Sequence, residues 1–171
     1  MIGKFIELFR LYFWSSEKYA RYRGVKIGAG CNIQKVSFGS EPYLISIGNR
    51  VQITDGTKFF THGGAWVLRE KQSDMDFFGK IVIQDNVYIG NNTLIMPGVC
   101  IGSNVIVAAG SVVTKSIDDN CIVGGNPAKV IGTVDNFFNK MLDFNLKTKG
   151  LSYDQKKNFL LLQSEEKFLK K

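Results

Sequence analysis

The residue best suited to acid–base chemistry is the single histidine, His62, in the segment Phe59-Phe-Thr-His-Gly-Gly64. An imidazole has an ordinary pKa of about 6.5, so it can accept a proton from a substrate at neutral pH. The segment also ends a run of regularly spaced apolar residues, and residues 65–80 do not continue that spacing. We interpret 65–80 as a loop, because sites are often built on loops beside rigid elements. The alternative is a structural histidine at a corner of the fold.

Other groups close to His62 in sequence could serve the same site. A carboxylate often orients a catalytic histidine through its second ring nitrogen. The nearby acids are Asp55, Glu70, Asp74 and Asp76. Gly63 and Gly64 would let a substrate approach the backbone closely. Trp66 could stack on a sugar ring, or it could simply hold the loop in place.

The elements that must position these groups show a period of six residues. From residue 83 onward every sixth residue is Ile or Val, at Ile83, Ile89, Ile95, Ile101, Val107 and Val113. The residue four places after each is small or β-branched, at Val87, Thr93, Val99, Val105, Ser111 and Ile117. An upstream run, with a break near 39–46, has its leading residues at Ile27, Ile33, Ile47, Ile53 and Phe59. A further piece begins at Val123, after a four-residue slip from Val113 to Ile117.

This period fits neither an amphipathic helix, which requires about 3.6 residues a turn, nor a simple strand with a period of two. It fits a β-solenoid, in which each hexapeptide forms one short strand and one corner. The leading aliphatic residue points inward, and Gly, Asn or Asp suits the tight corners. We therefore predict an all-β solenoid over residues 24–134, with helical segments at 1–23 and 135–171.

With this repeat the chain resembles the hexapeptide-repeat acyltransferases, and among them the maltose, galactoside and polysaccharide O-acetyltransferases. The similarity extends over about residues 24–134 and is most specific over 83–131. The segments that carry it are Ile47–Ile53, Ile83–Gly102, Ala108–Lys115 and Val123–Ile131, the last of which contains Asn126-Pro-Ala-Lys129. The resemblance implies a left-handed parallel β-helix, a hand that the period alone does not set.

The resemblance also implies an acetyltransferase that moves an acetyl group from acetyl-CoA to a hydroxyl of a sugar or surface polysaccharide precursor. The family's catalytic histidine precedes such a loop, so His62 is expected to be the general base. Related enzymes place an acid in or near the loop, and among the candidates we favour Glu70. The positions that match the coenzyme A site are Asn91, Ala109, Thr114, Lys115 and Lys129. The relatives form homotrimers with active sites between subunits, and no metal is expected.

Three other functions compete with this one. An N-acetyltransferase acting on an amino sugar or a xenobiotic would use the same base. A non-catalytic β-solenoid scaffold would show neither stabilisation by acetyl-CoA nor dependence on His62. A zinc enzyme of the same fold needs three histidine ligands, which this sequence lacks.

The flanks carry the net charge of +7. The charge is +4 over residues 1–26, zero over 27–134 and +3 over 135–171. No nucleic-acid-binding motif accompanies it, so we expect no nucleic-acid partner. Phe5, Leu8, Phe9 and Tyr12 recur at helical spacing. That helix would either pack on the solenoid or lie at an anionic membrane surface as a peripheral contact.

The remaining features concern localisation and the C-terminal segment. No apolar run reaches 18 residues, and no signal peptide is recognisable, so we expect a cytoplasmic protein, at the inner face of the membrane if the helix is interfacial. Cys31, Cys100 and Cys121 are interpreted as buried thiols in a reducing compartment. Downstream, residues 135–142 are predicted to form a helix, and Gly150 then interrupts the chain. A capping box over Ser152–Gln155 then opens a final helix that reaches Phe168.

Overall fold

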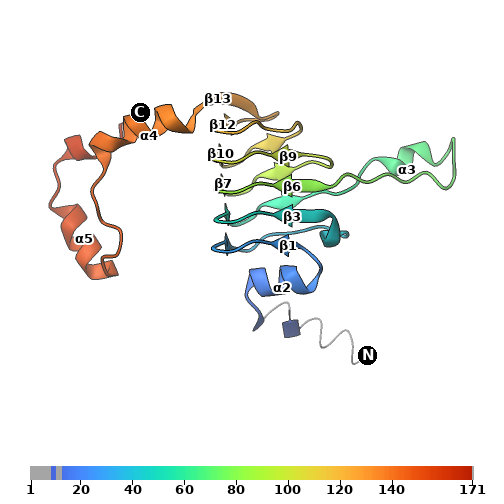
Figure 1. Ribbon diagram of the computed structural model, residues 1–171, viewed down its shortest axis with the longest axis horizontal. Coiled ribbons are helices and arrows are strands. Elements are labelled where there is room, and N and C mark those ends of the chain that lie inside the picture. The colour runs from blue at the N-terminus through green and yellow to red at the C-terminus, as the bar shows by residue number, and fades with distance from the viewer. Residues whose placement is uncertain (1–8, 11–12, 171) are drawn as a thin grey trace. The chain divides into compact units, whose positions relative to one another are not determined.

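The computed structural model describes residues 9–10 and 13–170. It divides into two compact units, Met1–Val134 and Asp135–Lys171. The first unit is a stack of short strands arranged in three sheets, shown in blue to yellow in Figure 1. The second unit is helical.

From β1 to β12, consecutive strands of the first unit belong to different sheets, so the chain coils from sheet to sheet. The first sheet contains β1 (Lys26–Ile27), β3 (Ile45–Ile47), β6 (Ile81–Ile83) and β9 (Cys100–Ile101). The second contains β2 (Asn32–Ile33), β4 (Gln52–Ile53), β7 (Val87–Ile89), β10 (Val105–Val107), β12 (Cys121–Gly124) and β13 (Lys129–Thr133). The third contains β5 (Lys58–Phe59), β8 (Leu94–Ile95) and β11 (Val112–Val113). Neighbouring strands are parallel except at β12 and β13, and the result is the predicted solenoid.

Most of the core of this unit is formed by the residues that the period of six singled out. In the first sheet Ile27, Ile47, Ile83 and Ile101 lie in register, one above the other. The second sheet stacks Ile33, Ile53, Ile89, Val107 and Val123, and the third stacks Phe59, Ile95 and Val113. All of these side chains are buried, as are the residues four places after the leading positions from 83 to 113. The prediction of the core is therefore confirmed.

Asparagine and aspartate occupy corners of the coil, as expected. Asn86, Asn92, Asn104 and Asn120 have positive φ, a conformation that asparagine adopts more readily than most residues. The Asn86 side-chain amide donates to Asn104 Oδ1 at 2.7 Å, so corners of adjacent coils are joined. Asp85 performs a similar role by accepting from the Asn49 backbone N–H at 2.6 Å.

Two departures from the period interrupt the coil. The first is the break near 39–46, where η1 (Pro42–Leu44) replaces a strand. The second runs from Gly63 to Gly79 and contains α3 (Ala65–Leu68). An antiparallel bridge between His62 and Phe78 closes its base. This second segment extends away from the stacked sheets as an arm (Figure 1), as the loop predicted over 65–80 was expected to do.

The N-terminal helix that the structure describes is α2 (Ser16–Tyr22). Ser15 caps it by accepting from the Lys18 backbone N–H at 3.2 Å. Its Ala20 is buried against the core. The apolar residues Phe5, Leu8 and Tyr12, on which the predicted helix over 1–23 rested, lie outside the described residues.

The C-terminal unit contains α4 (Val134–Met141), η2 (Leu142–Phe144), α5 (Tyr153–Leu161) and η3 (Glu165–Lys167). The predicted capping box is present, because Ser152 and Gln155 each accept from the other's backbone N–H. The final helix is shorter than predicted, ending at Leu161 instead of Phe168. Ser164 takes an extended conformation and opens η3, in keeping with the preference of serine for helix starts over helix interiors.

Replacing a leading residue of the core tests this architecture. Ile53→Ala removes a fully buried side chain from the middle of the second sheet, and we expect the free energy of unfolding to fall by about 2–5 kcal/mol. The control is Gln52→Ala at the adjacent, outward-facing position of β4. Denaturant unfolding followed by circular dichroism measures both variants. Equal losses in the two would contradict the assignment of Ile53 to the core.

Candidate active site

His62 lies where the coil is interrupted, three residues beyond Phe59 of β5. Phe59 and Thr61 are buried and anchor the backbone on either side of Phe60. The His62 side chain itself is 42% exposed. The His62 and Phe78 rings form an edge-type contact, with their centroids 5.6 Å apart and their planes inclined at 62°. The imidazole is therefore fixed at a rigid corner and open to solvent.

A carboxylate holds one of the two ring nitrogens of His62. Glu41 Oε2 lies 2.7 Å from His62 Nδ1 and also accepts from Thr61 Oγ1 at 2.6 Å. The Glu41 side chain is only 15% exposed. Glu70, which the sequence favoured for this position, is exposed on the arm and forms no hydrogen bond or ion pair with His62. Glu41, from the break at 39–46, therefore occupies the position beside Nδ1 that was expected for Glu70.

The charge of Glu41 decides which ring nitrogen of neutral His62 is protonated. The hydrogen bond from Thr61 is the largest cause that holds the pKa of Glu41 below its ordinary value of 4.5, partial burial opposes it, and His62 adds to the lowering. Glu41 is thus ionised at neutral pH and can only accept hydrogen bonds. A neutral His62 must then donate through Nδ1, which leaves the lone pair on Nε2. No residue that the structure describes hydrogen-bonds to Nε2.

Glu41 was missed because it lies 21 residues before its partner. The signal that could have found it was the interruption of the repeat. Both Glu41 and His62 stand where the period of six fails, and Ser37 in the preceding coil pairs with Lys58 in the coil of His62. An acid in the first break was therefore a candidate neighbour for a histidine beside the second.

The arm beside His62 contains the residues expected to contact the acceptor. A side chain at Gly63 would meet no atom within 4 Å, and Gly64 has positive φ at the start of α3. Trp66 is 81% exposed. Arg69 braces the arm by donating to the Met75 carbonyl at 3.1 Å. Within four residues of His62, the arm therefore has an uncrowded backbone at Gly63 and an exposed indole at Trp66.

The five residues expected to contact coenzyme A lie on the later coils, and all are exposed. Asn91 and Ala109 are on adjacent coils, joined where the Gly110 N–H donates to the Asn91 carbonyl at 2.8 Å. A Cβ on Gly90 would come within 2.4 Å of the Ala109 nitrogen, so the coils approach closely there.

The other three residues of this set follow in the next elements. Thr114 and Lys115 come directly after β11, and Lys129 begins β13. All five are therefore on the surface of the solenoid, and no bond described in the structure joins any of them to His62.

Comparisons with known proteins agree with this fold. Residues 80–115 match the family model described as bacterial transferase hexapeptide (six repeats). Protein CapG of Staphylococcus aureus is 50% identical over 155 residues, which are 88% of this chain and 90% of that protein.

The chain belongs to the hexapeptide-repeat acyltransferase family.

Two further similarities concern the chemistry of this family. A hexapeptide-repeat-containing acetyltransferase from Vibrio cholerae, solved in complex with acetyl coenzyme A, superposes with a TM-score of 0.59 at 25% identity, over 75% of this acyltransferase and 82% of that chain. Galactoside O-acetyltransferase of Escherichia coli is 34% identical over 96 residues, 56% of this chain. This match covers 47% of the galactoside enzyme, and the other curated relatives after CapG are likewise matched over about half their length or less. The protein is an acyltransferase.

Three further observations concern metal ligands, cysteines and membrane-spanning helices. Over residues 9–10 and 13–170, no cluster of three or more His, Cys, Asp or Glu side chains could hold a metal ion in this acyltransferase. Its three cysteines are free thiols and are half-buried instead of fully buried as expected, and Cys31 and Cys121 pack against the core. The coil corners and strand ends at which they lie leave part of each side chain open. In the part of the chain that is described, no helix has the length and apolar character needed to cross a bilayer.

Removing the Thr61 hydroxyl should change the titration of Glu41. The folded pKa of Glu41 lies below its unfolded value, so its ionised form stabilises the fold at higher pH. That stabilisation is lost as the pH falls through the folded pKa. Thr61→Val removes the largest cause of the lowering, so the midpoint of the Glu41 titration should rise and the pH-dependent part of the stability should become smaller. Carboxyl NMR titration and unfolding in the acid range measure both effects.

The control for this titration is Thr57→Val, which alters another buried threonine of the same coil. Thr57 donates to the Thr54 carbonyl at 3.0 Å and does not contact Glu41. The Glu41 titration should be the same in Thr57→Val and the unaltered protein. Identical Glu41 midpoints in Thr61→Val and the unaltered protein would contradict the role given to the Thr61 hydroxyl.

Proposed function

We propose that this acyltransferase moves the acetyl group of acetyl-CoA to a hydroxyl of a sugar or of a surface polysaccharide precursor, with His62 as the general base. The observation that carries the proposal is the contact between Glu41 and His62 Nδ1 at 2.7 Å, in a side chain whose Nε2 is open. A base fixed at a rigid corner beside an accessible surface is what proton abstraction from an acceptor requires.

In the proposed reaction Nε2 of His62 takes the proton of the acceptor hydroxyl while the acceptor oxygen attacks the thioester carbonyl carbon. The carbon–sulfur bond then breaks, the acetyl group stays on the acceptor oxygen, and the leaving thiolate receives the proton from Nε2. Atoms and charges balance without a further co-reactant. A positioned base of this kind contributes about 10²–10⁴-fold to the rate.

Glu41 is proposed as the positioning residue for His62. Its carboxylate accepts from Nδ1 and so keeps the lone pair on the nitrogen that faces solvent. It also stabilises the positive imidazolium that forms when Nε2 takes the proton. The hydroxyl of Thr61 holds the same carboxylate oxygen, which limits how Glu41 can rotate.

Acetyl-CoA is proposed to lie along the later coils of a left-handed solenoid. Asn91, Ala109 and Thr114 would border its pantetheine arm, and Lys115 and Lys129 would meet its phosphates as point charges. The exposure of these side chains supports this assignment. We further propose a homotrimer in which one subunit supplies His62 and a neighbour supplies much of the donor groove, since a cyclic arrangement suits flat prism faces.

The acceptor is proposed to contact the arm that follows His62. Gly63 and Gly64 leave the backbone open, and the exposed indole of Trp66 offers a face on which a sugar ring can stack. The similarity to galactoside O-acetyltransferase supports a hydroxyl of a sugar as the acceptor group.

The roles of the two acids and the histidine can be separated by matched variants. His62→Ala should keep the fold and lower kcat by at least about 10²-fold, and Glu41→Gln should lower it by a similar order, because an amide permits the wrong tautomer. Glu70→Gln is the control and should retain kcat. Acetyl transfer is measured against a panel of free sugars, glycans and nucleotide sugars, with circular dichroism to verify folding. Full turnover in His62→Ala would reject the mechanism, and a loss in Glu70→Gln equal to that in Glu41→Gln would reject the assignment of Glu41.

The donor site can be tested by removing its basic groups. Lys115→Ala and Lys129→Ala should each raise KM for acetyl-CoA by about tenfold, since each removes a charged partner of a phosphate. Lys26→Ala, on the outer face of β1, is the matched control. Steady-state kinetics with varied acetyl-CoA gives the values. If neither variant differs from the control, the donor lies elsewhere on the surface.

A further inference from the structure

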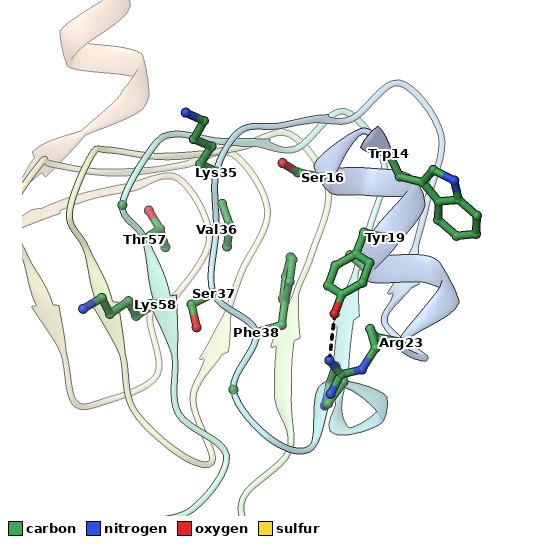
Figure 2. Close-up of a pocket in the computed structure, with 14 residues that line it drawn as sticks. Trp14, Ser16, Tyr19, Arg23, Lys35, Val36, Ser37, Phe38, Thr57 and Lys58 are labelled. Carbon is green, nitrogen blue, oxygen red and sulfur yellow. Dashed lines mark hydrogen bonds between the residues drawn. The ribbon is translucent and has the colours of Figure 1, made fainter. Parts of the chain in front are cut away.

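A hollow of about 820 Å³ opens at the N-terminal end of the solenoid, between α2 and the segment 35–39 (Figure 2). This volume is within the range of small-molecule sites. Tyr19 and Arg23 from α2 and its C-cap line one side. Lys35, Ser37 and Lys58 line the other, and Figure 2 shows Lys58 on the opposite side of Ser37 from Tyr19 and Lys35 beyond Val36.

The hollow is cationic. Among the described residues that line it, Arg23, Lys35 and Lys58 are basic and none is acidic. Lys35 and Lys58 are exposed, and their side chains form no hydrogen bond or ion pair with any residue over 9–10 and 13–170. Arg23 donates to the Tyr19 hydroxyl at 3.1 Å, which holds its guanidinium at the wall. The charge therefore favours an anionic ligand.

The hollow and the site at His62 share a wall. Gly39 and Pro42 line the hollow, and Glu41, the partner of His62, lies between them in the chain. The same segment is hydrogen-bonded to β5, which leads to the histidine, because the Phe59 N–H donates to the Ser37 carbonyl at 2.9 Å. The wall of the hollow therefore continues into the segment that carries Glu41 and into the strand that leads to His62.

We infer that the hollow binds the diphosphate of a glycosyl diphosphate acceptor, while the sugar lies at His62. The inference rests on the proposed function and narrows its substrate class. Basic side chains from separate elements suit a group with several anionic oxygens, and lysine meets phosphate as a mobile point charge. The aromatic side of the hollow borders the remainder of the acceptor, which is either a nucleoside or a lipid chain.

The test compares three acceptors that carry the same sugar: a nucleoside diphosphate sugar, a short-chain polyprenyl diphosphate sugar and the free sugar. The unaltered protein should have a lower KM for at least one of the diphosphates than for the free sugar. The double variant Lys35→Ala/Lys58→Ala should reduce this preference by about tenfold or more. Lys26→Ala, an exposed lysine on another sheet, should keep it. The diphosphate with the lower KM identifies the source of the acceptor.

A binding measurement makes the outcome independent of turnover. By calorimetry, the unaltered protein should bind a nucleoside diphosphate or inorganic diphosphate, and the double variant should bind it about tenfold or more weakly. Absence of binding to the unaltered protein, or equal binding to the double variant, overturns the inference. Failure to acetylate any acceptor while diphosphate binding depends on the lysines counts against the proposed function instead.

Discussion

The structure depends on the burial of one aliphatic column in each sheet. Ile53 and Ile89, like the other leading residues, meet their counterparts in adjacent coils and are removed from water. A single coil cannot bury this surface, so each coil is stable only against its neighbours. Backbone hydrogen bonds between coils, such as that from the Gly48 N–H to the Ile83 carbonyl at 2.8 Å, fix the register. The stack is therefore a rigid support, and its corners hold side chains in defined places.

Chemistry is concentrated where this stack is interrupted. The break that contains η1 brings Glu41 to the same corner from which the arm departs after His62. Because the coils on both sides remain packed, the two breaks do not loosen the core, and Phe38 still stacks on Phe59 with 5.2 Å between ring centroids. The same first break borders the cationic hollow, so base, positioning acid and hollow are all built around one stretch of irregular chain.

The proton chemistry at His62 depends on the Glu41 carboxylate, which accepts two hydrogen bonds. Thr61 and His62 both donate to one oxygen of Glu41, and the favourable contacts of its charged form lower the pKa of that group. An ionised acceptor leaves only one neutral form of His62 that fits the contact. The local fold thus decides which nitrogen is available as a base, and the threonine contributes without facing the substrate.

The sequence by itself determined the coil and its core, because the period of six is local and recurs at residues such as Ile83 and Ile101. It also determined the capping box at Ser152, whose partners are three residues apart. Only the tertiary structure decided that Glu41, and not Glu70, accompanies His62, and that Lys35 and Lys58 border one hollow. Those groupings join residues from different coils, and their contacts depend on how the irregular segments between strands fold back. No repeat in the sequence encodes that path.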